Sequence, residues 1–389
     1  MIRNARKNRF LASALISCAM IATQAVPVAN ACTTLMYQDL EGRFYAGRTL
    51  ELSMELPYEV TFIPKGSQYV SKAGDTEAGL SYTTKHQILA ITVPDVNPKD
   101  LKVLEGMNDK GLTFSLLAFA GTSGPKESFD KTKAALAAID LGSWTLGQFA
   151  NVDEVKTALS QQPVLLTPLA ALGGADTPFH YVLHDKSGAS IVIEFANNKQ
   201  TVYDNPVGVM TNAPTFQWHL TNLNNYTFFS NIDKSTNKFG SLNVSQPDSG
   251  IATVALPASN TSVGRFVRAV YYSHFAQKVS DRDEATRTLA HIMNNFDRPK
   301  DITIDMGAGG SEGVAKSGES SGPFTSEYTS WTALHDIDRG TLYLRTYKDM
   351  NYKKFDLNEL AKSDKVLSIP LSAIDGMAGD STGKLLAEM

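Results

Sequence analysis

The feature that most constrains this sequence is its N-terminal leader, because the leader determines where the folded chain begins. Four basic residues precede an apolar run over 10–28, which ends in Ala-Asn-Ala at 29–31. This order is typical of a secretory signal peptide and its cleavage site. The run is near the ~20-residue length of a membrane span, but four polar residues interrupt it. We therefore expect residues 1–31 to be a signal peptide, and Cys32 to begin a periplasmic or secreted chain.

The residues that remain, 32–389, are sufficient for one domain with its own core. The sequence is 42% hydrophobic and 20% charged, which excludes a disordered chain. Cleavage removes four basic residues and no acidic one, so the net charge falls from −4 to −8. That charge argues against binding to nucleic acid. No second apolar segment of spanning length follows, so no membrane anchor is expected. We expect a single domain, with a mobile tail from about residue 370.

Cleavage also leaves Cys32 as the only cysteine of the mature chain, because Cys18 departs with the leader. Exported proteins normally use cysteines in pairs, as disulfides. Three interpretations remain open: a buried small hydrophobe, a lipid-anchored lipoprotein cysteine, and a catalytic nucleophile. A chain terminus is an unusual place for a core residue. Ala29 and Asn30 fit a lipoprotein signal poorly.

The catalytic interpretation follows from the position of the residue. An N-terminal cysteine carries its thiol and a free α-amine on one residue. The ordinary pKa is about 8.5 for the thiol and about 8 for the amine. The amine can take the thiol proton and later return it to a leaving amine. This chemistry needs no histidine, and a precursor with an amide in place of the amine would be inactive.

The residues after Cys32 predict a β-hairpin. Segments 32–37 and 44–48 have strand composition and flank a turn-like stretch at 39–42. Such a hairpin would return Arg48 to the side of Cys32, where a guanidinium lowers the pKa of a thiol. Glu51 could then accept a hydrogen bond from the α-ammonium. A surface ion pair is the alternative role for these two charges.

The rest of the chain predicts a layered α+β fold, because strands occur in groups flanked by helices. The expected strands are 179–185, 189–195, 201–203, 207–210, 342–347 and 353–357, and the expected helices are 131–149, 152–160 and 283–295. Asn151 is the expected N-cap of the second helix. The Gly- and Ser-rich segment 305–323 is an expected loop without phosphate-loop spacing. The seven histidines show no metal-ligand spacing, so we expect no metal and no cofactor.

Several short motifs resemble the choloylglycine hydrolase and penicillin V acylase family. They occur in the family's order along almost the whole mature chain, at Cys32, 47–51, 106–112, 179–194, 208–214, 218–223 and 262–266. The resemblance implies an N-terminal nucleophile hydrolase of the Gram-negative exported type, with a four-layer αββα sandwich fold, that cleaves linear amide bonds.

The same resemblance implies roles for individual residues. Cys32 would be nucleophile and base, supported by Arg48 and Arg265. The side chain of Asn212 and the backbone N–H of Ala118 would form the oxyanion hole. From its turn after a strand alone, Asn212 could equally be a turn-capping residue. Glu51 stands where the family usually has Asp. Apolar residues expected to line the substrate pocket are Met54, Leu56 and Phe119.

The family's substrates are penicillin V, conjugated bile salts and N-acyl homoserine lactones, so the resemblance implies a small-molecule N-acyl amide as substrate. It also implies a homotetramer. Two alternatives stay open on the same fold. One is a catalytically silent periplasmic binding or envelope protein, and the other is a lipoprotein anchored through Cys32.

Overall fold

The computed structural model describes residues 31–71, 79–95, 97, 99–124, 134–169, 175–304, 325–376 and 379–388. The leader, apart from Ala31, lies outside these residues, as do the whole loop expected at 305–323 and the first residues of the helix expected at 131–149.

Two large sheets face each other in the centre of the described chain. The first, sheet A, has the order β16 (Val209–Met210), β1 (Ala31–Gln38), β2 (Phe44–Leu52), β19 (Tyr328–Asp336), β20 (Thr341–Thr346), β21 (Lys353–Asp356), β23 (Gly379–Asp380). The second, sheet B, has the order β15 (Lys199–Asp204), β14 (Ser190–Ala196), β13 (Phe179–Asp185), β8 (Leu112–Ala118), β7 (Leu101–Asn108), β6 (Ile88–Pro94), β3 (Glu59–Ile63), β22 (Leu367–Pro370). One contiguous hydrophobic cluster runs through both sheets and the helices packed on them.

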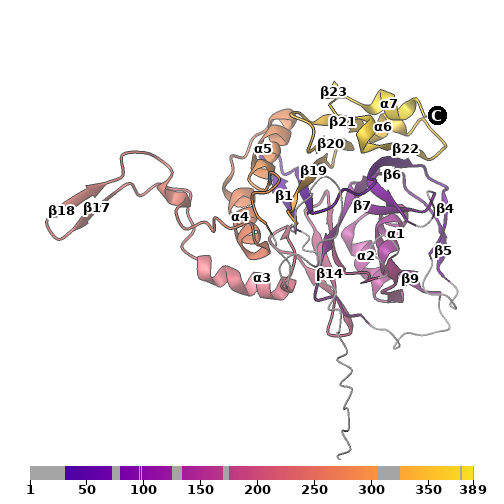
Figure 1. The fold of residues 1–389 in the computed structure, drawn as a ribbon, viewed down its shortest axis with the longest axis horizontal. Helices are drawn as coiled ribbons and strands as arrows, with labels where there is room; N and C mark the ends of the chain where they lie inside the picture. Colours follow the sequence, from indigo (N-terminus) through magenta and orange to yellow (C-terminus); the bar gives the residue numbers. More distant parts are fainter. Residues whose placement is uncertain are drawn as a thin grey trace, which may run out of the picture.

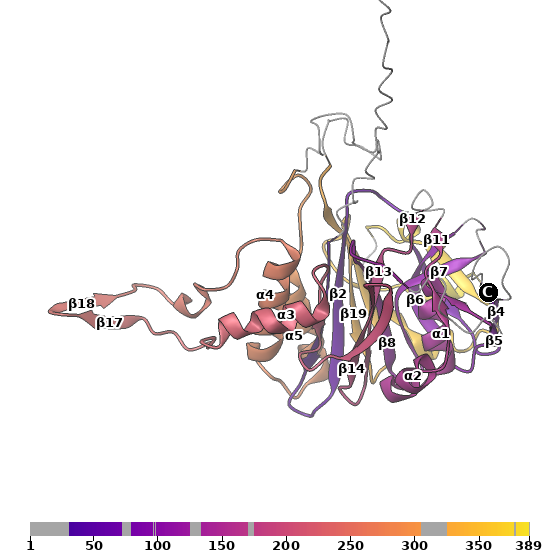
Figure 2. The same ribbon diagram turned by 90° about the horizontal axis from the view of Figure 1, so that it is seen from below.

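Helices cover the outer face of each sheet. Helix α4 (Ser262–Phe275) packs on β1, and α5 (Arg282–Asn294) packs on β2 and β19. On the other side α1 (Leu141–Gln148) packs on β7 and β8, and α2 (Val152–Leu159) packs on β13. Figure 2 shows these layers in succession, from α4 and α5 through both sheets to α1 and α2. The αββα sandwich is therefore confirmed.

Smaller elements decorate the sandwich. Four short strand pairs are β4–β5 (Gln68–Val70, Ser81–Thr83), β9–β10 (Leu136–Ala137, Val164–Leu165), β11–β12 (Pro168–Leu169, Ala175–Asp176) and β17–β18 (Thr236–Phe239, Leu242–Ser245). The described residues also form the α-helices α3 (Phe216–Asn222), α6 (Leu357–Leu360) and α7 (Thr382–Leu386). The segment after residue 370 folds back onto the body through α7, where Leu385 is buried.

The expected strands and two of the three expected helices are confirmed within one or two residues at their ends. Asn151 caps α2 by accepting a hydrogen bond from the Glu154 N–H. The helix expected over 131–149 is wrong for the described residues 134–140: Ala135 forms a bridge with Gly79, and 136–140 form β9 and a 3₁₀ turn. This Ala- and Leu-rich stretch favours a helix locally, but it is buried and pairs with β10, so packing overrides propensity.

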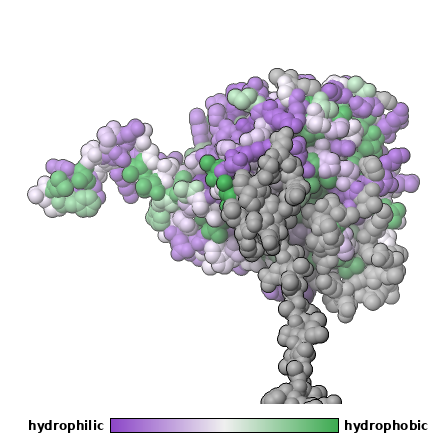
Figure 3. All heavy atoms as spheres, viewed as in Figure 1, coloured by the Kyte–Doolittle hydropathy of each residue, from purple (hydrophilic) through white to green (hydrophobic). Residues whose placement is uncertain are grey.

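One hairpin leaves the body of the molecule. Residues 230–250, which we call the arm, carry β17 and β18 far from both sheets (Figure 1). Ile232, Phe239 and Leu242 on the arm are each more than 60% exposed, and apolar surface is visible at its tip (Figure 3). An isolated two-stranded hairpin is marginally stable in water, and the arm leaves these apolar side chains exposed.

The close pairing of β6 and β7 generates a test of the fold. Gly106 lies opposite Ala90, and a Cβ at Gly106 would stand 2.8 Å from the Leu89 carbonyl oxygen. Because backbone cannot yield cheaply, Gly106→Ala should lower the free energy of unfolding by about 1–3 kcal/mol, as measured by urea denaturation. Gly383→Ala in α7 meets nothing within 4 Å and should be neutral or slightly stabilising. Equal stabilities of the two variants would contradict this packing.

Candidate active site

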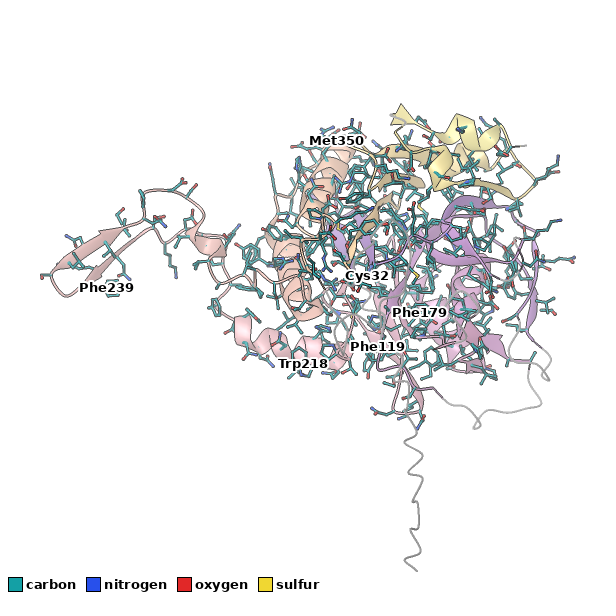
Figure 4. All side chains as sticks on the ribbon, viewed as in Figure 1. Cys32, Phe119, Phe179, Trp218, Phe239 and Met350 are labelled. Carbon is teal, nitrogen blue, oxygen red and sulfur yellow. The ribbon has the colours of Figure 1, made fainter. Side chains whose placement is uncertain are left out.

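Cys32 is held at the centre of the molecule by the pairing of β1 with both of its neighbours (Figure 4). On one edge Cys32 lies opposite Leu50, and Thr34 lies opposite Arg48. On the other edge Thr34 lies opposite Met210, so the same register continued by two residues places Asn212 opposite Cys32. The predicted hairpin is thus confirmed, and sequence positions far apart converge on one residue.

The sulfur faces the space between the sheets, where Arg48 meets it. Arg48 Nη2 is 3.4 Å from Cys32 Sγ, and both side chains are buried. The guanidinium also donates to the carbonyl oxygens of Leu104 (2.8 Å) and Leu116 in sheet B. The guanidinium carbon of Arg48, Cζ, lies 5.0 Å from the centre of the Trp331 ring. Arg48 therefore fixes the sulfur and ties sheet A to sheet B.

A carboxylate completes this buried charge cluster. Glu105 accepts from Arg48 Nη1 at 3.3 Å and from His335 Nε2 at 2.9 Å. Burial alone would lower the pKa of Arg48, but Cys32 and Glu105 beside it raise that pKa above its ordinary value. The guanidinium accordingly stays charged next to the sulfur. Sequence reasoning missed Glu105, although a lone acid in an apolar strand was a usable signal.

The main chain of Cys32 is held from the opposite face by α4. Arg265, one turn into that helix, donates to the Cys32 carbonyl oxygen, to Thr33 Oγ1 at 2.8 Å and to Asn212 Oδ1 at 2.7 Å. Burial lowers the pKa of Arg265, and the nearby Glu51 and Cys32 raise that pKa without fully offsetting the effect of burial. The helix begins at the right place because Thr261 caps it by accepting from the Gly264 N–H.

The amide of Asn212 has one orientation that satisfies its neighbours. Its Oδ1 accepts from the Cys32 backbone nitrogen at 2.7 Å as well as from Arg265. Its Nδ2 donates to the Ala118 carbonyl oxygen at 2.8 Å. An Asn side-chain nitrogen carries two hydrogens, so one N–H remains for another acceptor near Cys32.

Ala118 supplies a backbone N–H on the same side. Ala118 lies opposite Phe179, and the N–H of the next residue, Phe119, donates to the Pro178 carbonyl oxygen. In this antiparallel pattern Ala118 and Phe179 form a non-hydrogen-bonded pair. The N–H and carbonyl of Ala118 therefore both point away from β13, towards Asn212.

Glu51 lies on the other face of β2 from Arg48, towards Arg265. It accepts from Thr329 Oγ1 at 3.3 Å, and its second oxygen is buried without a hydrogen bond to any described residue. Burial raises the pKa of Glu51 to about 7, against the lowering effect of Arg265. The Cys32 nitrogen, expected to meet Glu51, has Asn212 Oδ1 as its acceptor here.

The three residues expected to line one substrate pocket lie in different surroundings. Leu56 lines a cavity of about 420 Å³ together with Tyr58, Tyr328 and Lys300. Tyr58 packs edge-on against Trp331 at 6.0 Å, which links this cavity to the ring beside Arg48. Met54 is half-buried against the core. Phe119 is buried and stacks on His180 at 5.0 Å.

The described part of the chain holds neither a candidate metal site nor a candidate membrane-spanning helix. No group of three or more His, Cys, Asp or Glu residues there could hold a metal ion. No helix among the described residues is long and apolar enough to cross a bilayer.

Known proteins with related sequences include a bile salt hydrolase/transferase and a penicillin V acylase. The chain is 30% identical over 350 residues to a bile salt hydrolase/transferase of Clostridium perfringens, covering 87% of this chain and 98% of the relative. It is 28% identical over 317 residues to a penicillin V acylase of Pectobacterium atrosepticum, covering 79% and 78%.

Solved structures show the same fold. A conjugated bile acid hydrolase variant from Clostridium perfringens superposes with a TM-score of 0.73 at 25% identity, over 87% of this chain and 96% of that one. A penicillin V acylase from Agrobacterium tumefaciens gives 0.70 at 21% identity, over 91% and 96%. The profile of the linear amide C–N hydrolases, choloylglycine hydrolase family, matches residues 32–366. The chain therefore belongs to the choloylglycine hydrolase family of linear amide C–N hydrolases.

Proposed function

We propose that the protein is an exported N-terminal cysteine hydrolase that cleaves small N-acyl amides through a thioester on Cys32. The observation that carries this proposal is that three side chains hydrogen-bond to Cys32 at once. Asn212 accepts from its backbone nitrogen, Arg48 donates to its sulfur, and Arg265 donates to its carbonyl oxygen. The family profile begins its match at Cys32, which supports removal of residues 1–31.

The proposed reaction uses each of these contacts. After processing, the α-amine of Cys32 donates one N–H to Asn212 Oδ1 and uses its lone pair to take the thiol proton. The sulfur, held beside the Arg48 cation, attacks the amide carbon. The resulting oxyanion accepts from the second N–H of Asn212 Nδ2 and from the Ala118 N–H.

Collapse of the tetrahedral intermediate breaks the C–N bond, and the α-ammonium gives its proton to the leaving amine. Water then attacks the thioester, which releases the carboxylic acid and restores the thiol. For the acyl part we propose an apolar group, with Leu56 among its contacts. The named relatives support penicillin V and conjugated bile salts as the first substrates to test, and N-acyl homoserine lactones belong in the same panel.

Two variants test the nucleophile and its amine. Cys32→Ala, processed like the parent, should lose at least about 10³-fold in kcat because no other nucleophile replaces the sulfur. A chain that retains Ala31 should be similarly inactive, since its Cys32 nitrogen is an amide. Turnover of the substrate panel and the intact mass of the exported protein are the measurements. Parental turnover by either variant, or a lipid-modified Cys32, would reject the mechanism.

The environment of Glu51 gives a stability prediction for the chain that retains Ala31. The pKa of Glu51 is about 7 in the fold and about 4.3 when exposed. The folded state therefore binds the proton more tightly, and its stability is full below about pH 4 and declines as pH rises through 7. Glu51→Gln removes this decline. Between pH 5 and pH 8, the free energy of unfolding of Glu51→Gln should therefore rise relative to that of the parent by on the order of 2 kcal/mol. Urea denaturation at both pH values measures this difference. Parallel pH profiles would show that Glu51 is ionised without cost.

We also propose that the protein is a homotetramer assembled through the arm. The exposed apolar residues Phe239 and Leu242 support this role. The double substitution Phe239→Asp and Leu242→Asp should reduce the assembly to smaller species, because charge at an apolar contact is costly to bury. Light scattering after size-exclusion chromatography measures the mass. Met350→Asp, at a residue 92% exposed away from the arm, is the control and should leave the mass unchanged. A tetramer that survives the double substitution would exclude the arm.

A further inference from the structure

We propose that His180, paired with Glu194, is a positioning residue that holds the two oxyanion donors in register with each other. The proposal rests on the proposed function of Ala118 and Asn212, and it adds a residue that touches neither the sulfur nor the reacting carbonyl.

The ring of His180 contacts the immediate neighbour of each donor. Its Nε2 lies 2.8 Å from the carbonyl oxygen of Thr211, which precedes Asn212. Its face stacks on Phe119, which follows Ala118, with ring centroids 5.0 Å apart and an interplanar angle of 6°. His180 is fully buried in β13. One rigid ring thus spans the two segments, which belong to different parts of the chain.

Glu194 contacts the other end of the turn that carries Asn212, residues 211–216. Its Oε1 accepts from the Phe216 N–H at 2.8 Å and lies 3.3 Å from His180 Nδ1. Residues 211–216, the turn that presents Asn212, are therefore held at both ends by this pair. Ser262 and His219 add contacts from other elements. Ser262 Oγ accepts from the Asn212 N–H at 2.9 Å, and His219 Nε2 donates to the Asn212 carbonyl oxygen at 2.9 Å.

The contact with Thr211 fixes the position of one hydrogen on the ring. A carbonyl oxygen only accepts, so His180 Nε2 carries the hydrogen of that contact.

Two isosteric variants separate the contacts of the ring. In His180→Gln the amide nitrogen stands near the position of Nε2 and can still donate to Thr211. In His180→Asn the amide nitrogen stands near the position of Nδ1, so the bond to Thr211 is lost. Oxyanion donors act in the transition state, so kcat should respond and KM should not. We expect kcat within a few-fold of the parent for Gln, and about 10–100-fold lower for Asn.

The assay substrate is whichever of penicillin V, glycocholate and N-hexanoyl homoserine lactone the parent hydrolyses fastest. The second readout is the rate of alkylation of Cys32 by iodoacetamide, a displacement at carbon that creates no oxyanion. This rate should be equal in the parent and in both variants. His184→Asn is the matched control, because His184 is equally buried on the same strand and its ring nitrogens have no hydrogen bond in the described residues.

The outcomes separate the two proposals. Inactive Cys32→Ala with parental kcat in His180→Asn would overturn the role of His180 and leave the nucleophile standing. Active Cys32→Ala would overturn the proposed function itself. Equal losses of turnover and of alkylation in His180→Asn, or an equal loss of kcat in His184→Asn, would show that the ring only supports the fold. Selective loss of kcat in His180→Asn, with rescue by His180→Gln, supports the proposal.

Discussion

The burial of the Arg48 cation between the two sheets is the interaction on which the rest of the structure depends. A guanidinium in a dry interior is costly unless its donors are satisfied and its charge is balanced. Arg48 meets both conditions with groups from sheet A and sheet B: the Leu104 and Leu116 carbonyls, Glu105 and the sulfur of Cys32. The sheets can therefore close only in the arrangement that also presents the sulfur to a positive charge. The same buried cation thus joins the two sheets and faces the Cys32 sulfur.

Cys32 is contacted from both faces of β1. The face towards sheet B carries the sulfur and Arg48, and the face towards α4 carries Arg265 and Glu51. Asn212 joins the faces from the strand edge, because β16 stops two residues short and a side chain takes the place of the next ladder bond. A strand edge is well suited to this task, since its N–H groups are available to a side chain as well as to backbone.

Much of this arrangement could be read from the sequence, and the omissions have physical causes. The β1–β2 hairpin follows from local alternation and a turn, and its register then brings Arg48 to Cys32. Arg265 and Asn212 came from family resemblance, because no local pattern brings residues more than 150 positions apart together. His180 and Glu105 were missed because each lies in a buried strand without polar alternation, so the only available signal was a polar or charged residue among apolar ones. The arm was missed because its isolated hairpin buries no core.

The position of Ala31 has a consequence for the order of events in the life of the chain. Ala31 is the first residue of β1, lies opposite Glu51 and is only 5% exposed. A peptidase needs its scissile bond extended and accessible from both sides, which a paired central strand does not permit. On the processing we propose, the leader must therefore be cut while β1 is still unpaired. On the mechanism we propose, a precursor that closed its sandwich first would be trapped as a folded but inactive molecule, because its Cys32 nitrogen would remain an amide.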